Sequence, residues 1–298
     1  MIAARAVTAL LDIGNTRIKL GWVRPDTGER EPAVLAVDHD EHRALLPWLA
    51  HQGLIPVSVL GVNVAGEALA QTLEAGFRSA GAGAVRWLQG EAQAAGVTNA
   101  YLQPARLGPD RWAAMLGLAG RLAHDRQIAL LASFGTATTL DTLSPAAHAQ
   151  STPALPGCEW VYEGGLILPG AMLMRQALAS GTARLPEAQG PAHAFPRHTH
   201  QAIASGVVAA QAGAVLRQWL AAWQRYGSAP AVFCTGGAWP LVADEVRALL
   251  RQTAALAGLA APVIHEITSP ILDGLARLAG PDAGPGTGTQ SAGSGSRP

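Results

Sequence analysis

Five residues near the start of the chain, Asp12–Thr16, place a carboxylate, a glycine and two polar side chains directly after a short apolar run. Burying a carboxylate is costly unless a cation or hydrogen-bond donors satisfy it. A hard cation such as Mg²⁺ would satisfy it through oxygen ligands, and Gly14 would let the backbone approach a bulky anion. The segment therefore predicts a phosphate site with a metal-binding carboxylate; an ordinary hairpin with an Asp in its turn is the alternative.

A second turn of the same kind is expected at Phe134–Thr139, where small residues and hydroxyls could cradle another part of a polyphosphate. Leu10–Thr16 aligns with Leu131–Ala137, so that Ser133 corresponds to Asp12, 121 residues earlier. Such a spacing is about one domain. It indicates a duplicated α/β fold with a cleft between the halves, unless the short match recurs by chance.

Gly108–Arg111 has the composition of a helix start, because proline suits the first turn of a helix. Asp110 in that turn could accept a proton from a substrate hydroxyl, and Arg111 could clamp a carboxylate or phosphate. The alternative is that Asp110 only favours the positive end of a surface helix.

Two further glycine-rich segments, Gly164–Gly170 and Thr235–Gly237, could each let a flat ring or a phosphate approach the backbone. The chain has neither a Walker A lysine loop nor a GxGxxG motif, which excludes the P-loop and dinucleotide-binding interpretations. His198 and His200 form an isolated HxH that is more typical of a solvated loop than of a metal site.

Composition narrows the class of protein. The 298 residues carry no formal net charge, 49% are hydrophobic and 14% are charged. This predicts a folded protein with a large core and no broad basic surface for nucleic acid. Cys158 and Cys234 are too few for a disulfide scaffold, and no apolar run is long enough to span a membrane, so a cytoplasmic location is expected.

Apolar runs and helical spacing predict the elements that position these motifs. We expect strands at 7–11, 18–22, 57–62, 84–88, 128–132, 138–143, 166–168, 231–234 and 263–267. We expect helices at 67–77, 109–123, 171–179, 201–226, 240–250 and 271–278. Residues 144–160 are expected to form a loop, and the small residues within 201–226 would suit either a dimer interface or a packed core helix.

The predicted domain organisation is an N-terminal α/β domain over residues 1–124, a C-terminal α/β domain over 125–279, and a disordered tail over 280–298. The tail is composed almost entirely of Gly, Ala, Ser, Thr and Pro, with very little apolar surface to bury.

In their order and spacing, four of these motifs resemble the type III pantothenate kinases, a family in which some members are described as accessory transcription factors. The motifs are Asp12–Thr16, Gly108–Arg111, Phe134–Asp141 and Gly164–Gly170. The resemblance covers residues 7–278. It implies an α/β fold of two duplicated actin-like (sugar-kinase-like) domains with a cleft between them.

The resemblance also implies an activity: ATP-dependent phosphorylation of pantothenate to 4′-phosphopantothenate, the first step of coenzyme A synthesis. It implies a cytoplasmic homodimer that uses Mg²⁺ and a monovalent cation, K⁺ or NH₄⁺. Direct contact with nucleic acid or with a membrane is not expected.

Residue roles follow from the same resemblance. Asp110 is the implied proton acceptor, and Asp12 helps to hold Mg²⁺. ATP is implied to contact Asp12, Ile13, Gly14, Asn15, Thr16, Arg17, Ile18, Lys19 and Thr136. Pantothenate is implied to contact Tyr101, Gly108, Pro109, Asp110, Arg111 and Thr182.

One position departs from the family. Ser133 stands where the family usually has an aspartate that binds the monovalent cation. Serine is neutral and a weaker ligand for a hard cation, so the cation is either bound loosely by Ser133 and backbone carbonyls or not used.

Two other classes of function remain open on the same scaffold. One is a non-catalytic ATP-binding regulator that acts on transcription through a partner. The other is an ATPase or phosphatase in which water replaces the pantothenate hydroxyl. Retention of Asp12, Asp110 and Arg111 favours the kinase over a regulator with a decayed site.

Overall fold

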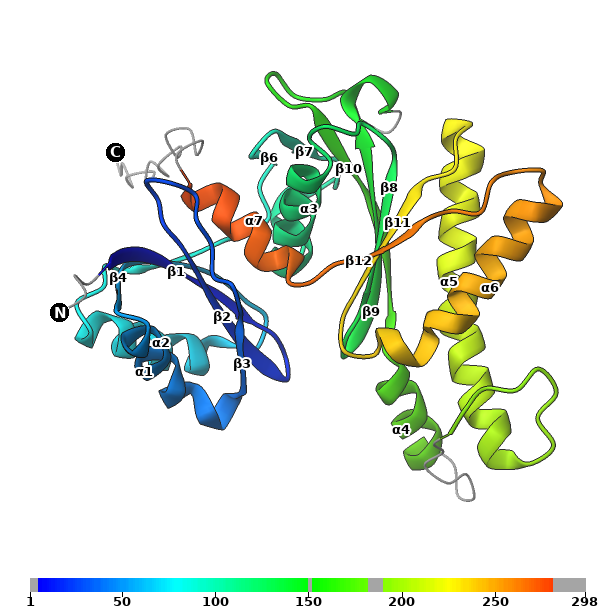
Figure 1. The fold of residues 1–298 in the computed structure, drawn as a ribbon, viewed down its shortest axis with the longest axis horizontal. Helices are drawn as coiled ribbons and strands as arrows, with labels where there is room; N and C mark the ends of the chain where they lie inside the picture. The colour runs from blue at the N-terminus through cyan, green and yellow to red at the C-terminus, as the bar shows by residue number, and fades with distance from the viewer. Residues whose placement is uncertain (1–4, 150–151, 182–189, 281–298) are drawn as a thin grey trace, which may run out of the picture.

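The computed structural model describes residues 5–149, 152–181 and 190–280. These residues form two β-sheets that lie side by side, each with its own covering helices, and two further helices between them (Figure 1). We call the part built on the first sheet the first lobe and the part built on the second sheet the second lobe. The expected tail lies outside the described residues apart from Gly280.

The first lobe has a five-stranded sheet in the order β3-β2-β1-β4-β5. Its strands are β1 (Arg5–Ile13), β2 (Arg17–Val23), β3 (Leu35–Asp38), β4 (Leu54–Asn63) and β5 (Val85–Trp87). Its helices are the 3-10 helix η1 (His39–Ala44), α1 (Leu45–His51) and α2 (Glu67–Ser79). One sheet face and the buried sides of α1 and α2 share an apolar core that includes Leu11, Leu49 and Phe77.

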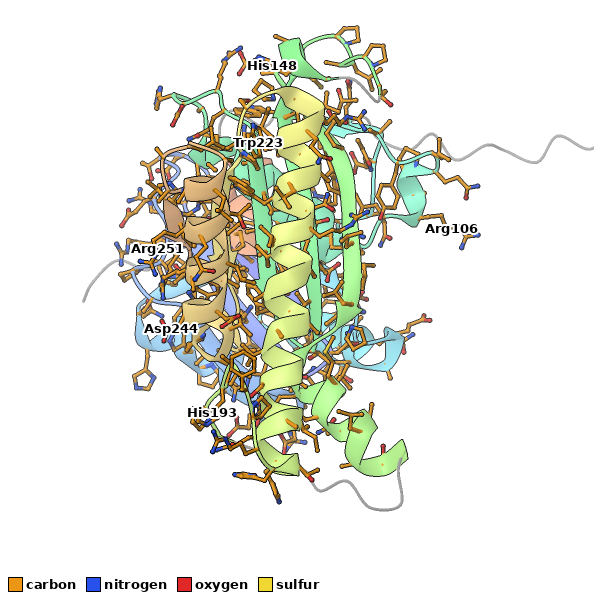
Figure 2. The ribbon with its side chains drawn as sticks, turned by 90° about the vertical axis from the view of Figure 1, so that its right-hand side faces the viewer. Arg106, His148, His193, Trp223, Asp244 and Arg251 are labelled. Carbon is orange, nitrogen blue, oxygen red and sulfur yellow. The ribbon has the colours of Figure 1, made fainter. Side chains whose placement is uncertain are left out.

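The second lobe has a seven-stranded sheet in the order β12-β11-β8-β9-β10-β7-β6. Its strands are β6 (Gln93–Ala94), β7 (Val97–Asn99), β8 (Ala129–Phe134), β9 (Ala137–Pro145), β10 (Trp160–Pro169), β11 (Ala231–Thr235) and β12 (Ile264–Glu266). Its helices are the 3-10 helix η3 (Ala146–His148), α4 (Ala171–Gly181), α5 (Thr199–Tyr226) and α6 (Trp239–Leu256). Figure 2 shows α5 and α6 lying side by side over one face of this sheet.

The two sheets repeat one topology, which confirms the predicted duplication. In each lobe the first strand pairs antiparallel with the second and parallel with the fourth, and the second pairs antiparallel with the third. Strand β8 takes the place of β1, and Ser133 and Asp12 both stand one residue before the end of these strands. The actin-like α/β arrangement is therefore present in both halves.

Helices α3 (Pro109–Arg121) and α7 (Pro270–Ala279) pack together between the lobes. Their backbones touch at glycines: a Cβ on Gly274 would lie 1.9 Å from the Ala113 carbonyl oxygen, and one on Gly117 would lie 2.1 Å from that of Pro270. One cluster of buried side chains runs through both helices and reaches Leu10 of the first sheet and Leu131 of the second. The two lobes thus share a core at this crossing.

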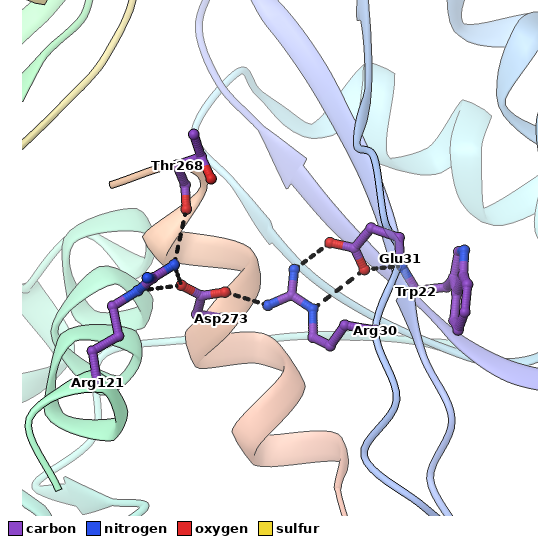
Figure 3. A network of polar contacts seen from close by, with 6 residues as sticks. All are labelled: Trp22, Arg30, Glu31, Arg121, Thr268 and Asp273. Carbon is purple, nitrogen blue, oxygen red and sulfur yellow. Dashed lines mark hydrogen bonds and ion pairs between the residues drawn. The ribbon is translucent and has the colours of Figure 1, made fainter. Parts of the chain in front are cut away.

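An ion-pair network ties the first lobe to this helix pair on the outer side (Figure 3). The Asp273 carboxylate of α7 accepts hydrogen bonds from Arg30, in the segment after β2, and from Arg121 at the end of α3. Arg121 also donates to the Thr268 carbonyl oxygen at 3.3 Å. The network fixes the chain just before and within the first turn of α7.

The sheets do not divide the chain at residue 124. Strands β6 and β7, before that position, pair in the second sheet, whereas α7, near the C-terminus, packs against β1 of the first. The division into domains at residues 124 and 125 stays a prediction.

The predicted strands and helices are all present, most within three residues of the expected bounds, but several parts of the chain differ, among them α6, which ends at Leu256 and not at residue 250. Strand β10 begins at Trp160, well before the expected 166–168, and β9 runs to Pro145, which shortens the loop expected over 144–160. Strand β3, helix α1 and the short β6–β7 hairpin were not predicted. Within the described ranges, no helix combines the length and apolar character needed to cross a membrane.

Candidate active site

A buried carboxylate near the end of β1 lies opposite the only lysine of the sequence, which is in β2. Asp12 is 5% exposed, and its Oδ2 accepts a hydrogen bond from Lys19 Nζ at 3.1 Å. Asp12 and Lys19 stand opposite each other in the antiparallel ladder, which is why the two side chains meet. Burial raises the pKa of the Asp12 carboxyl, Lys19 opposes that rise, and the charge of nearby Asp110 adds to it.

The corresponding turn between β8 and β9 carries hydroxyls in place of charges. The Gly135 amide donates to the Ala137 carbonyl oxygen at 3.1 Å, which closes the turn. The hydroxyls of Thr136 and Thr16 lie 3.0 Å apart and share a hydrogen bond, so the tips of the two turns meet across the lobes. The predicted pairing of the two turns is therefore present.

Asp110 occupies the first turn of α3, after Gly108 and with Pro109 as the first helical residue. Its Oδ1 accepts a hydrogen bond from the Arg111 amide at 2.8 Å. A Cβ on Gly108 would lie 2.7 Å from that Oδ1, so glycine leaves room for the carboxylate at this position. The side chain is half-buried and open to the space between the lobes.

These features surround one cavity of about 300 Å³ between the two lobes. Its wall combines both turns, the start of α3, the β11–α6 turn and the start of α7. Its polar and glycine lining residues include Asp12, Gly14, Asn15, Thr16, Arg17, Lys19, Asp110, Arg111, Ser133, Gly135, Thr136, Thr139, Asp141, Thr235, Gly236 and Ser269.

Several residues expected at the site lie beside the cavity or away from it. The side chains of Ile13 and Ile18 are fully buried in the core of the first lobe and do not face the cavity. Tyr101, Gly108 and Pro109 are adjacent to it but do not line it. Thr182 lies outside the described residues.

Arg111 differs most from expectation. It is 6% exposed, and its guanidinium already forms an ion pair with Asp141, with Nη2 2.5 Å from Oδ1. Its Nη2 also donates to the Tyr162 hydroxyl at 2.7 Å, and its Nη1 donates to the Tyr101 hydroxyl at 2.8 Å. The side chain is therefore not a free fork for a substrate anion, although it still lines the cavity.

Sequence reasoning assigned no role to Asp141 or Tyr162. The Tyr162 hydroxyl accepts from Arg111 and donates to Asp141 Oδ1 at 2.8 Å. Burial and the charge of Asp141 raise the pKa of this hydroxyl, which keeps it protonated as a donor. The available signal was an aspartate in an apolar strand pattern, which requires a cationic partner when buried.

Two glycines of the Gly164–Gly170 segment pack closely against the protein's own chain. A Cβ on Gly165 would lie 2.4 Å from Asp141 Oδ1, and one on Gly170 would lie 2.2 Å from the Gly135 carbonyl oxygen. These glycines let β10 and the start of α4 pack against the Asp141 carboxylate and the second turn. For Gly165 and Gly170 these contacts account for glycine without any ligand; the interpretation that the segment admits a ring or a phosphate stays a prediction.

The donor set at the cavity suits Mg²⁺. Asp12 and Asp110 both face it, and the charge of Asp110 helps to raise the pKa of the Asp12 carboxyl. Mg²⁺ in phosphoryl-transfer sites is held by one or two carboxylates together with substrate phosphates and water. Among the described residues, no group of three or more His, Cys, Asp or Glu side chains is placed to hold a metal ion.

Comparison with known proteins gives the family. Residues 9–221 match the model of the family described as "Type III pantothenate kinase". A type III pantothenate kinase from Bordetella bronchiseptica is 48% identical over 272 residues, covering 91% of this chain and 96% of that protein. One from Aromatoleum aromaticum is 40% identical, covering 78% and 86%.

Among solved structures, a glucokinase from an Antarctic psychrotroph has a TM-score of 0.47 and 9% identity, covering 92% of this chain and 98% of that one. The resemblance drawn from the sequence motifs is confirmed by the family match and by the relatives' identity over most of the chain: this chain belongs to the type III pantothenate kinase family.

Proposed function

We propose that this chain transfers the γ-phosphoryl group of ATP to the hydroxyl of pantothenate, forming 4′-phosphopantothenate in the first step of coenzyme A synthesis. The observation that carries the proposal is that Asp12, Asp110 and Thr136, from three separate elements, line one cavity between the lobes. Membership of the family supports pantothenate as the acceptor.

Asp110 is the proton acceptor in this proposal. Pantothenate binds with its hydroxyl beside the Asp110 carboxylate, and the hydroxyl oxygen attacks the γ-phosphorus in line with the leaving ADP oxygen. The O–H proton passes to Asp110 as the new P–O bond forms and the bond to the β-phosphate oxygen breaks. A half-buried carboxylate on a rigid helix start suits this task because its position is fixed.

The two turns hold the nucleotide phosphates in this proposal. Residues 12–19 supply backbone amides and the Lys19 ammonium, and Thr136 contributes its hydroxyl from the other lobe. Asp12 would hold Mg²⁺, which when bound neutralises charge on the phosphates. The protein forms no covalent bond to the phosphoryl group in this proposal, since catalysis of phosphoryl transfer depends mainly on positioning the reactants and neutralising charge.

Pantothenate is proposed to lie against Tyr101, Gly108–Arg111 and Thr182. Asp110 and Arg111 line the cavity, and Tyr101 is tied to it by its bond to Arg111. For the monovalent cation, Ser133 lines the same cavity with a hydroxyl where the family usually has a carboxylate. We therefore infer a weak response to K⁺ or NH₄⁺.

We also infer that the protein acts as a homodimer in the cytoplasm. Exposed apolar side chains gather on β10 and α4: Ile167, Met172, Leu173 and Leu178. Gly206 and Ala209 on α5 are exposed as well, whereas its other face packs in the core. Exposed apolar side chains that gather on neighbouring elements favour a protein contact there. Light scattering of the purified protein measures the oligomeric state.

The experiment is ADP release measured with and without pantothenate. Pantothenate-dependent release supports the kinase, equal release supports an ATPase, and no release supports a non-catalytic regulator. Asp110→Asn should lose roughly 10²–10⁴-fold in kcat while still binding ATP. Asp244→Asn, on the exposed side of α6, is the matched control and should leave turnover unchanged. Retained turnover in Asp110→Asn would remove Asp110 as the base.

A further inference from the structure

We propose that Asp141 and Tyr162 are positioning residues that hold the Arg111 guanidinium and, through it, the Tyr101 hydroxyl, so that this edge of the site presents fixed donors to the acceptor substrate. The inference rests on the proposed function, because it concerns how the pantothenate side of the cavity is built.

Most N–H groups of the Arg111 guanidinium already form hydrogen bonds within the protein. Its Nε lies 3.1 Å from Asp141 Oδ1, and its two Nη2 bonds go to Asp141 and to Tyr162. One Nη1 bond goes to Tyr101. A guanidinium has five N–H hydrogens, so among the described residues one Nη1 hydrogen remains for a substrate.

Charge is balanced within this arrangement. Asp141 is 1% exposed and Arg111 is 6% exposed, so neither charge is screened by bulk water. Breaking a buried pair by removing one partner leaves an uncompensated charge, whereas replacing both partners by neutral groups is often tolerated. Arg111 in the native protein therefore acts as a fixed hydrogen-bond donor more than as a free positive charge.

Tyr101 depends on this arrangement for its place. It stands on the loop after β7, where its amide bonds to the Asn99 side chain. Its ring stacks on that of Tyr162, with centroids 5.8 Å apart and planes 16° apart. Because its oxygen accepts from Arg111 Nη1, its own hydrogen points away from Arg111 and is a second donor.

The strand pairing is shaped around Asp141. The β9–β10 ladder shifts register between Tyr162 and Gly164, which puts Gly165 opposite Asp141. Since a Cβ on Gly165 would lie 2.4 Å from Asp141 Oδ1, only glycine lets β10 pass the carboxylate at this distance. The shift also leaves Tyr162 close enough to donate to Asp141.

Steady-state kinetics of Tyr162→Phe provide the main test. The substitution removes the hydroxyl that bridges Arg111 and Asp141 but keeps the ring that stacks on Tyr101. We expect KM for pantothenate to rise roughly 3- to 10-fold, with KM for ATP unchanged. Tyr226→Phe is the matched control, because Tyr226 ends α5 and does not line this cavity, and it should change neither constant. A wild-type pantothenate KM in Tyr162→Phe, or equal rises in both KM values, would overturn the proposal.

A double-mutant cycle separates positioning from a merely structural ion pair. Asp141→Asn should raise KM for pantothenate roughly 10- to 100-fold. Arg111→Met combined with Asp141→Asn is neutral and should fold even if Asp141→Asn alone does not. If Asp141 acts through Arg111, the double variant has the same pantothenate KM as Arg111→Met, with no added effect. Additive effects would overturn the proposal.

Two controls complete the design. Glu31→Gln breaks a buried glutamate–arginine pair at residues that do not line this cavity, and it should leave the pantothenate KM unchanged. An equal rise in that variant would make the effect one of general destabilisation and would overturn the inference. If the wild-type protein shows no pantothenate-dependent turnover, the proposed function itself fails and this inference falls with it.

Discussion

The two turns at the cavity occupy the same place in a repeated topology, yet one is charged and the other is not. In the first lobe Asp12 stands opposite Lys19; in the second, Ser133 stands opposite Thr139. Duplication therefore sets where a side chain lies, while the residue type sets what it can bind. The first turn is equipped for a divalent cation and phosphates, and the second for neutral hydrogen bonds.

The turns also differ in how they are supported. The glycine within each turn has similar room: a Cβ on Gly14 would lie 3.4 Å from the Arg17 carbonyl oxygen, and one on Gly135 would lie 3.5 Å from that of Ala137. The second turn is enclosed by backbone, because Gly170 and Gly236 each pass within 2.2 Å, measured from a Cβ position, of carbonyl oxygens in Phe134–Gly135. The first turn is thus the more adaptable of the two.

Removing the charge from the first turn should have the largest effect. Asp12→Asn should lower kcat/KM by about 10²–10³-fold, because the charge that would hold Mg²⁺ is lost. Thermal stability should stay level or rise, since burial already disfavours the Asp12 charge and raises its pKa. Ser133→Ala, the matched change in the second turn, should stay within about fivefold of wild type. Equal losses in the two variants would contradict the comparison.

Crowding the supported turn should cost stability more than crowding the open one. Gly170→Ala should lower the free energy of unfolding by about 1–3 kcal/mol, because the new methyl group meets the Gly135 and Thr136 carbonyl oxygens. Gly14→Ala should cost less than about 1 kcal/mol. Urea unfolding followed by tryptophan fluorescence measures both free energies. A larger loss in Gly14→Ala would show that the first turn, and not the second, is the more tightly packed.

Much of this arrangement is predictable from local sequence. In each lobe an apolar run leads into a glycine-containing turn, and this pattern is sufficient to place Asp12 near the end of one hairpin strand and Thr136 in the turn of the other hairpin. The start of α3 is equally local, because proline after glycine indicates where the helix begins and so positions Asp110.

The partners of Arg111 could not be predicted in the same way. Asp141 and Tyr162 are 30 and 51 residues away along the chain, and the pairing depends on the register of β9 with β10. A register shift near Gly164 moves that pairing by one residue, and nothing local specifies it. Helix α1 was missed for another reason: it has only seven residues and contains Pro47, so it shows no clear helical period.

Placing a carboxylate at position 133, beside the second turn, should give the protein the K⁺ dependence expected of family members that carry aspartate there. Ser133→Asp should steepen the dependence of kcat on K⁺, because a carboxylate binds a hard cation better than a hydroxyl does. The parent protein should respond weakly over the same range at constant ionic strength. Choline chloride is the control salt, and identical K⁺ responses in parent and variant would show that position 133 does not bind the cation.

Breaking the hydrogen bond between Thr16 and Thr136 should have the smallest effect on activity. Thr16→Val removes one hydroxyl of the 3.0 Å pair with Thr136 in an exposed setting, so KM for ATP should rise only about two- to fivefold. Thr136→Val should match it, and the double variant should add little, since both changes break the same contact. Thr72→Val, which removes a hydroxyl bonded within α2, is the matched control. If the two effects add fully, each hydroxyl acts on the nucleotide by itself and the turns do not work as a pair.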